Sequence, residues 1–278
     1  MKKILITILC LGMLTACTAN TNNNNEAQTK DTTETTTATA NQTPEITGLG
    51  SQYYSTEKVI WGPGRADNHQ RPTDPVSLQE SYGRLGAQFI MNDDKFICLT
   101  FDEGYENGYT PKILDTLKDK GVKAIFFVTY DFVKDNPKLI ERMIDEGHII
   151  GNHTYRHYTM DEVSQEEATE EIEFLDKYMK ENFKYRMTLF RFPKGEFSEN
   201  TLALADELGY KSVFWSFAYA DWDQNNPADP KEAFDTITTY THNGEIMLLH
   251  AVSQTNADIL GDVIDEVRNQ GYEFTVEI

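Results

Sequence analysis

Two histidines and two carboxylates in this 278-residue chain have residue types and spacing that could do chemistry. His153 and His157 are separated by three residues in His-Thr-Tyr-Arg-His. On a helical turn both imidazoles would face one point, which suits a divalent metal, although the spacing alone is equally consistent with two surface histidines. Asp102 and Glu103 are adjacent in Thr-Phe-Asp-Glu-Gly, so one carboxylate can act as a base while the other binds the metal. A helix cap would explain only one of these acids, and the two motifs together favour a metal site.

Further polar residues lie at or just beyond the ends of apolar runs. Arg191 ends one run and could fix a carboxylate base, and keep it ionised, through a bidentate pair. A surface salt bridge is the alternative, but the apolar neighbours of Arg191 disfavour it. Asp221 and Trp222 lie beyond another run, and His250 immediately follows a third. The remaining histidines are expected to have no chemical role: His69, His148 and His242.

An alternation of strand and helix patterns positions these residues. Apolar runs typical of buried strands lie at 96–101, 124–128, 148–151, 189–191, 212–215, 245–249 and 273–276. Caps and periodicity predict helices near 110–121, 137–147, 164–181, 199–208, 230–240 and 256–270.

This alternation predicts an α/β fold with about seven parallel strands. Helices on every connection favour a closed, distorted (β/α) barrel, although an open sheet would show the same alternation. In a barrel the loops that follow the strands share one rim, where barrel enzymes keep their active sites. The polar residues named above would therefore meet at that rim.

Five segments resemble the ordered motifs of the NodB-type polysaccharide deacetylases, carbohydrate esterase family 4. They are T-F-D-E-G at 100–104, H-T-Y-R-H at 153–157, R-F-P-K-G at 191–195, D-W at 221–222 and L-L-H at 248–250. The resemblance covers roughly residues 96–278. It implies a distorted (β/α) barrel and the metal-assisted removal of acetyl groups from N-acetylated or O-acetylated sugars.

The resemblance also implies a role for each matching residue. The catalytic set is Asp102 as base, His250 as acid, Arg191 as the residue that orients the base and Asp221 as the charge partner of His250. The metal set is His153, His157 and Glu103, holding one divalent ion. Zinc is favoured, and cobalt, manganese or iron would fit the same ligands. The substrate-binding set is Trp222 and Leu248 as walls for the acetyl methyl group, with Pro193 and Lys194 from R-F-P-K-G.

Two positions depart from the family pattern. Glu103 stands where the family has Asp, which puts its metal contact in doubt. Ala218 replaces an acid commonly found before the D-W pair, so the partner of His250 would be Asp221 alone.

Four flanking segments, 104–111, 146–153, 214–222 and 250–257, are similar to the delta-lactam-biosynthetic de-N-acetylases of spore formers. That branch implies deacetylation of N-acetylmuramic acid in peptidoglycan after an amidase has removed the stem peptide. The freed amine then closes to the muramic delta-lactam of spore cortex. Lys194 could pair with the exposed lactyl carboxylate. The alternatives are a deacetylase of N-acetylglucosamine, chitin-like oligomers or acetylated xylan, and a sugar-binding lipoprotein that has lost catalysis.

The net charge and the N-terminal sequence indicate which partners are excluded and where the protein is located. A net charge of −20 argues against nucleic acid as a partner. Residues 1–17 resemble a lipoprotein signal ending in L-T-A-C, with an ordinary signal peptide as the alternative. A lipid on Cys17 would hold the protein on the outer face of the bacterial cytoplasmic membrane, in the forespore envelope if it acts in sporulation. We expect a disordered Thr/Asn-rich tether at 18–45, an irregular extension packed on the barrel at 46–95, a monomer, and no disulfide.

Overall fold

The computed structural model describes residues 53–278 of the chain. The signal peptide, Cys17, the tether at 18–45 and the first residues of the extension, predicted from sequence, lie outside the described residues. No helix within 53–278 has both the length and the apolar character needed to cross a membrane.

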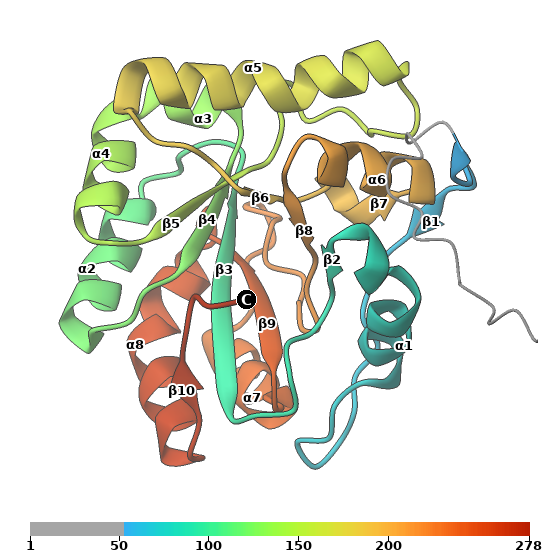
Figure 1. The fold of residues 1–278 in the computed structure, drawn as a ribbon. Coiled ribbons are helices and arrows are strands. Elements are labelled where there is room, and N and C mark those ends of the chain that lie inside the picture. The colour runs from blue at the N-terminus through green and yellow to red at the C-terminus, as the bar shows by residue number, and fades with distance from the viewer. Residues whose placement is uncertain (1–52) are drawn as a thin grey trace, which may run out of the picture. The chain divides into compact units, whose positions relative to one another are not determined.

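Eight parallel strands form the main sheet (Figure 1). They are β2 (Ala87–Gln88), β3 (Phe96–Glu103), β4 (Ile125–Val128), β5 (Ile149–Asn152), β6 (Leu189–Phe190), β8 (Lys211–Val213), β9 (Glu245–His250) and β10 (Glu273–Phe274). Neighbours follow the order β3, β4, β5, β6, β8 and β2, while β9 and β10 both pair with β3. The seven strands expected from the sequence are confirmed, and β2 is an addition to them.

The sheet curls into a distorted barrel because the chain beyond β8 returns to β9. Phe217 forms an isolated parallel bridge with Met247, and the Leu248 N–H donates to the Phe217 carbonyl at 2.9 Å. At the other end of β9, the Met91 N–H donates to the Gly244 carbonyl at 2.8 Å. These contacts replace a regular ladder between β8 and β9, which is why the barrel is distorted.

Helices cover the outside of the barrel (Figure 1). They are α1 (Thr73–Tyr82), α2 (Thr110–Lys120), α3 (Tyr130–Asp135), α4 (Pro137–Asp145), α5 (Gln165–Phe183), α6 (Glu199–Glu207), α7 (Pro230–Tyr240) and α8 (Gln254–Asn269). Sequence signals place several ends correctly: the capping box of Ser164 and Glu167 begins α5, and Gly121, with φ of +63°, ends α2.

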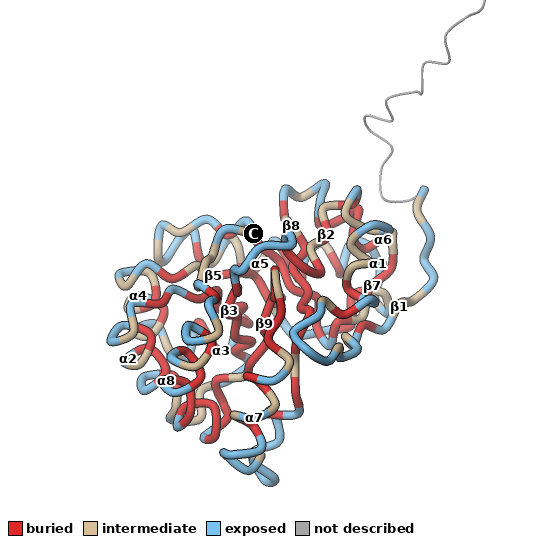
Figure 2. The backbone as a smooth tube through the Cα atoms, turned by 90° about the horizontal axis from the view of Figure 1, so that it is seen from below, coloured by how far each residue is buried: buried red, intermediate tan, exposed pale blue. Residues whose placement is uncertain are grey.

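The core lies between the strands and these helices. Figure 2 shows the buried residues concentrated along the central strands and the exposed ones on the outer helices and loops. Strand β4 is buried throughout, and β3 is buried from Ile97 onward, as expected for strands covered on both faces. Among residues 53–278 the cysteine is Cys98, which is buried in β3 as a free thiol.

The N-terminal extension is more regular than its sequence suggested. Pro72 and Pro75 flank the start of α1, where a proline costs no helical hydrogen bond. The extension also supplies β1 (Val59–Ile60), which pairs with β7 (Glu196–Phe197), and β2 of the main sheet. The prediction of an irregular segment was therefore wrong. Strands of two residues are too short to give a periodic pattern in the sequence.

Candidate active site

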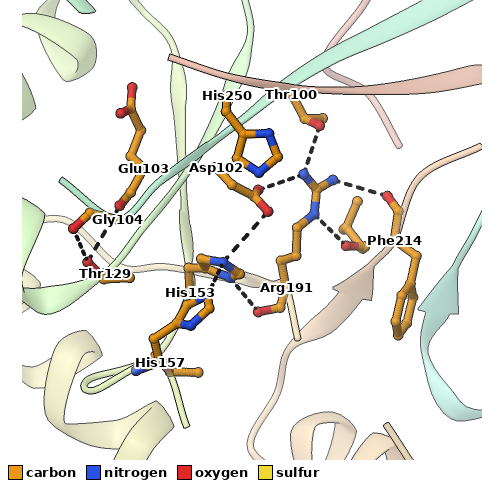
Figure 3. A network of polar contacts seen from close by, with 12 residues as sticks. Thr100, Asp102, Glu103, Gly104, Thr129, His153, His157, Arg191, Phe214 and His250 are labelled. Carbon is orange, nitrogen blue, oxygen red and sulfur yellow. Dashed lines mark hydrogen bonds and ion pairs between the residues drawn. The ribbon is translucent and has the colours of Figure 1, made fainter. Parts of the chain in front are cut away.

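Asp102 and Glu103 occupy the last two positions of β3 and point to opposite faces of the strand, as successive strand residues do. The Asp102 carboxylate faces the histidines, with Oδ2 at 3.6 Å from His153 Nε2. Figure 3 shows the Glu103 side chain turned away from them. Its Oε1 accepts a hydrogen bond from Thr110 Oγ1 at 3.4 Å, at the start of α2. In this structure the Glu103 carboxylate thus lies on the α2 side of β3, away from the histidines with which it was expected to bind the metal.

The two carboxyl groups differ in protonation as well as direction. Burial alone would raise the pKa of Asp102, but Arg191, with further contributions from His153 and His250, holds it below its usual value. Burial raises the pKa of Glu103 well above its usual value, and the negative charge of Glu106 raises it further. The surroundings of Asp102 therefore favour its anionic form, whereas those of Glu103 favour its protonated form.

Arg191 is fully buried inside the barrel, which excludes the surface salt bridge. Its Nη1 donates to Asp102 Oδ1 at 2.8 Å and to Thr100 Oγ1 at 2.9 Å. Its other donors are used by backbone carbonyls, with Nε on Val213 at 2.9 Å and Nη2 on Phe214 at 3.0 Å. The predicted bidentate pair is therefore a single hydrogen bond, because Nε and Nη2 are engaged by the carbonyls of Val213 at the end of β8 and of Phe214.

His153 and His157 meet, although not on a helical turn. They lie in the loop after β5, where Thr154 and His157 have positive φ angles of 75° and 59°. This backbone brings the two Nε2 atoms to 3.2 Å. His153 Nδ1 donates to the Arg191 carbonyl at 2.9 Å (Figure 3), so Nε2 is the nitrogen that carries the lone pair. The predicted helical turn was wrong, but the convergence of the imidazoles was right.

The electrostatics of the histidine pair suit metal binding. Burial lowers the pKa of His153, and burial together with His153 lowers the pKa of His157 to about 4. Neutral imidazole is the form that binds a metal. Two nitrogens on a tetrahedral zinc, each about 2.05 Å from the metal, would be about 3.3 Å apart, close to the separation of the two Nε2 atoms. Within residues 53–278, no group of three or more His, Cys, Asp or Glu side chains is arranged to hold a metal, so protein ligands beyond the pair are not preformed.

The pKa of His250 is shifted in the opposite direction to those of His153 and His157. Burial alone would lower the pKa of His250, but the charge and hydrogen bond of Asp221, with a contribution from Asp102, outweigh burial and raise it. Asp221 Oδ1 lies 2.7 Å from His250 Nδ1, and Asp221 Oδ2 accepts from the His250 backbone N–H at 2.7 Å. Asp221 is thus the partner of His250, as the D-W motif predicts. Asn256, which the motifs did not identify, donates to the same carboxylate at 2.6 Å.

A cavity of about 590 Å³ joins these groups. Its lining includes Asp102, His153, His157 and His250 together with Trp222, Leu248 and Lys194. Trp222 has 58 % of its surface exposed, and its ring centroid lies 6.0 Å from that of His250. Pro193 is buried and does not line the cavity, so its assignment to the substrate-binding set was wrong. The proline instead forms the short turn that carries Lys194.

One wall of the cavity comes from residues that the motifs did not identify: Trp61, Gly62, Pro63, Trp215 and Tyr219. Trp61 Nε1 donates to the Trp215 carbonyl at 3.0 Å, which fixes the extension against the barrel. Gly195 has φ of +70°, and a Cβ there would come within 2.7 Å of the Trp215 ring, so the glycine of R-F-P-K-G lets Trp215 pack against this turn. The aromatic Trp61 ahead of a Gly-Pro turn is the one signal that could have indicated this wall.

Comparison with known proteins places this site in a family. A family model described as polysaccharide deacetylase matches residues 90–213. The chain is 44 % identical over 220 residues to the peptidoglycan-N-acetylmuramic acid deacetylase PdaA of Bacillus subtilis, covering 78 % of this chain and 84 % of PdaA. It is 34 % identical to a peptidoglycan-N-acetylglucosamine deacetylase of Bacillus cereus, covering 66 % of this chain and 87 % of that protein.

Solved structures agree with the sequence matches. The structure of Bacillus subtilis PdaA, a family 4 carbohydrate esterase, superposes with a TM-score of 0.76 at 42 % identity, covering 80 % of this chain and 95 % of that chain. A family 4 carbohydrate esterase from Bacillus anthracis gives a TM-score of 0.66 at 38 % identity with the same coverage. The chain therefore belongs to the polysaccharide deacetylases of carbohydrate esterase family 4 and is a hydrolase.

Proposed function

We propose that the protein is a metal-dependent enzyme that removes the N-acetyl group of N-acetylmuramic acid in peptidoglycan whose stem peptides have been cut away. The observation that carries this proposal is that one cavity is lined by a carboxylate whose pKa is lowered and an imidazole whose pKa is raised. Asp102 is held as an anion and the pKa of His250 is raised, which are the states that a general base and a general acid need. The freed amine could then close onto the lactyl carboxyl to give a muramic delta-lactam.

His153 and His157 are the residues that would hold the metal, with zinc favoured by the separation of their Nε2 atoms. A divalent ion bound there would polarise the acetyl carbonyl and lower the pKa of a bound water. Asp102 Oδ2, near the pair, is the oxygen placed to accept the proton of the attacking water. Oδ1 is occupied by Arg191, which fixes the direction of the carboxylate and keeps it ionised.

His250 completes the reaction at the sugar nitrogen. Its Nδ1 is bonded to Asp221, so Nε2 remains free of that pair to donate a proton to the departing amine. Trp222 and Leu248 line the cavity and would contact the acetyl methyl group. The products would be acetate and a sugar with a free amine.

The choice of muramic acid rests on two observations. The relative with 44 % identity is named for activity on N-acetylmuramic acid, and its match spans most of both chains. The cavity also carries Lys194, whose ammonium could pair with a lactyl carboxylate. N-acetylglucosamine is the rival substrate, because the 34 % identical relative is named for it. A sugar-binding protein without catalysis would not need a base and an acid whose pKa values are shifted in opposite directions.

Acetate release tests the proposal directly. We expect release from amidase-treated peptidoglycan, much less from intact peptidoglycan and from N-acetylglucosamine oligomers, and none after chelation of the metal. Equal release from all three polymers would point to the rival substrate. Absence of release from any of them would contradict the enzymatic proposal.

Lys194→Met should lower activity on peptide-stripped glycan strands by about 10- to 100-fold, the effect of losing one hydrogen bond to a charged group. Activity on N-acetylglucosamine oligomers, which lack the carboxylate, should be nearly unchanged. The Lys194 side chain is exposed, and its Nζ bonds to Thr159 Oγ1 at 3.3 Å. Because the side chain is exposed, we expect Lys194→Met to fold normally. Lys118→Met is the matched control, because Lys118 is an exposed lysine in the last turn of α2. Equal loss on both substrates, or none on either, would remove Lys194 from recognition.

Location follows from the N-terminal sequence. We further propose export, lipid attachment at Cys17, and action as a monomer on the outer face of the cytoplasmic membrane after an amidase has removed the stem peptides. Cys17→Ala should release the protein from the membrane fraction, and an unchanged distribution would contradict the lipid anchor.

A further inference from the structure

The Asp221 carboxylate is in contact with two further donors besides the His250 imidazole. Its Oδ1 is bonded to His250 Nδ1. Its Oδ2 accepts from the His250 backbone N–H at 2.7 Å and from Asn256 Nδ2 at 2.6 Å. Asp221 and Asn256 are both buried, so these bonds lie out of contact with solvent. A carboxylate that accepts three hydrogen bonds is fixed in direction.

Asn256 itself is oriented from three sides. It lies in the first turn of α8, where its backbone N–H donates to the Ser253 Oγ that caps the helix, at 3.2 Å. Its Nδ2 donates to the His250 carbonyl at 3.1 Å as well as to Asp221. Its Oδ1 accepts a hydrogen bond from the Tyr219 hydroxyl. The amide therefore ties α8 to the backbone of His250, and Tyr219 reaches the same amide from the cavity wall.

We propose that Asn256 is a positioning residue for the catalytic acid: it fixes Asp221 so that Asp221 holds the His250 imidazole toward the sugar nitrogen, and Tyr219 in turn fixes Asn256. The inference rests on the proposed role of His250. It extends that role because the aspartate alone does not determine its own orientation. Ala218 stands near D-W in place of an acid. The side chain that contacts Asp221 besides His250 is the buried amide of Asn256.

Truncation of Asn256 should affect the chemical step more than substrate binding. In Asn256→Ala the Ser253 cap remains, because it uses the backbone N–H, but Asp221 loses a donor and gains freedom to rotate. We expect kcat to fall about 10- to 100-fold, the effect of one hydrogen bond to a charged group, with KM within about twofold. Asn256→Asp should lose at least as much, since it sets a second carboxylate against Asp221. Tyr219→Phe should show a smaller loss of kcat, about two- to tenfold for a neutral hydrogen bond.

A spectroscopic measurement separates this inference from the proposed function. The Nδ1 proton of His250, bonded to a carboxylate, should give a strongly downfield proton NMR signal in the wild-type protein. Asn256→Ala and Asn256→Asp should move that signal upfield or abolish it while the other resonances keep their dispersion. Asn182→Ala is the control, because the Asn182 amide also donates to a backbone carbonyl, that of Tyr178 at 2.9 Å, but Asn182 is exposed near the end of α5.

The outcomes are distinct. An unchanged downfield signal and wild-type kcat in Asn256→Ala would overturn the positioning role. A wild-type protein that releases no acetate would refute the proposed function, and the NMR signal would still decide whether Asn256 orients the Asp221–His250 pair. If the Asn256 variants do not fold, Tyr219→Phe carries the test, and a wild-type signal and kcat in that variant would contradict the inference.

Discussion

Asp102→Asn is expected to lower acetate release by about 10²-fold or more while the fold and the metal content stay unchanged. Asn has the shape of Asp, and its oxygen can still accept the hydrogen bond that Arg191 Nη1 makes to Oδ1 at 2.8 Å. The amide cannot accept a proton from water, so the variant should bind substrate without turning it over. The structure supports this choice of base because Asp102 faces the histidine pair and is held as an anion.

Glu103→Gln is the matched control for this variant. Glu103 is the adjacent residue, is buried, and has a pKa that burial raises, so an uncharged amide of the same shape should preserve its environment. Acetate release by Glu103→Gln should stay within a few-fold of wild type. Steady-state kinetics with metal analysis of both variants would check the pair. Near-normal activity in Asp102→Asn combined with a large loss in Glu103→Gln would place the base on the other face of β3.

The contrast between Asp102 and Glu103 shows where sequence information stopped. The motif T-F-D-E-G identified both acids, and the family pattern suggested that Asp102 would be the base and Glu103 a metal ligand of the same site. The direction of each side chain depends on how far β3 extends, and the strand runs through Glu103 rather than ending at Phe101 as expected. Because side chains alternate along a strand, two added positions were enough to separate the acids.

Other parts were predictable for clear physical reasons. Long apolar runs and helix caps are local signals, so the seven expected strands and six expected helices appear near their expected places. Convergence of loop residues at one rim follows from parallel strands. Two features could not be predicted from such local signals. One is the cavity wall that includes Trp61, and the other is the bond from the Asn256 amide to Asp221. Their positions depend on packing between segments far apart in the chain, such as the 154 residues that separate Trp61 from Trp215.

The histidine pair should bind one equivalent of a divalent metal, and loss of either imidazole should abolish that binding. Their Nε2 atoms are 3.2 Å apart, and no third protein ligand is preformed among residues 53–278, so each histidine supplies a large part of the affinity. Loss of the metal should raise the activation free energy by several kcal/mol, which lowers the rate about 10³-fold or more. We therefore expect His153→Ala and His157→Ala to lose both the metal and acetate release.

The two variants should differ in one respect that the structure explains. His153 is buried and donates to the Arg191 carbonyl, so His153→Ala leaves a cavity and an unpaired carbonyl beside the base and should also lower the melting temperature. His157 makes its backbone bond to Thr154 Oγ1 through N–H, which His157→Ala retains, so this variant should lose metal with little loss of stability. His69→Ala, remote from the pair along the chain and bonded to the Thr241 carbonyl, is the control for metal content. Metal retained at one equivalent in His157→Ala, measured by elemental analysis and calorimetric titration with zinc, would show that the ion lies elsewhere and that Asp102 and His250 act without help from the pair.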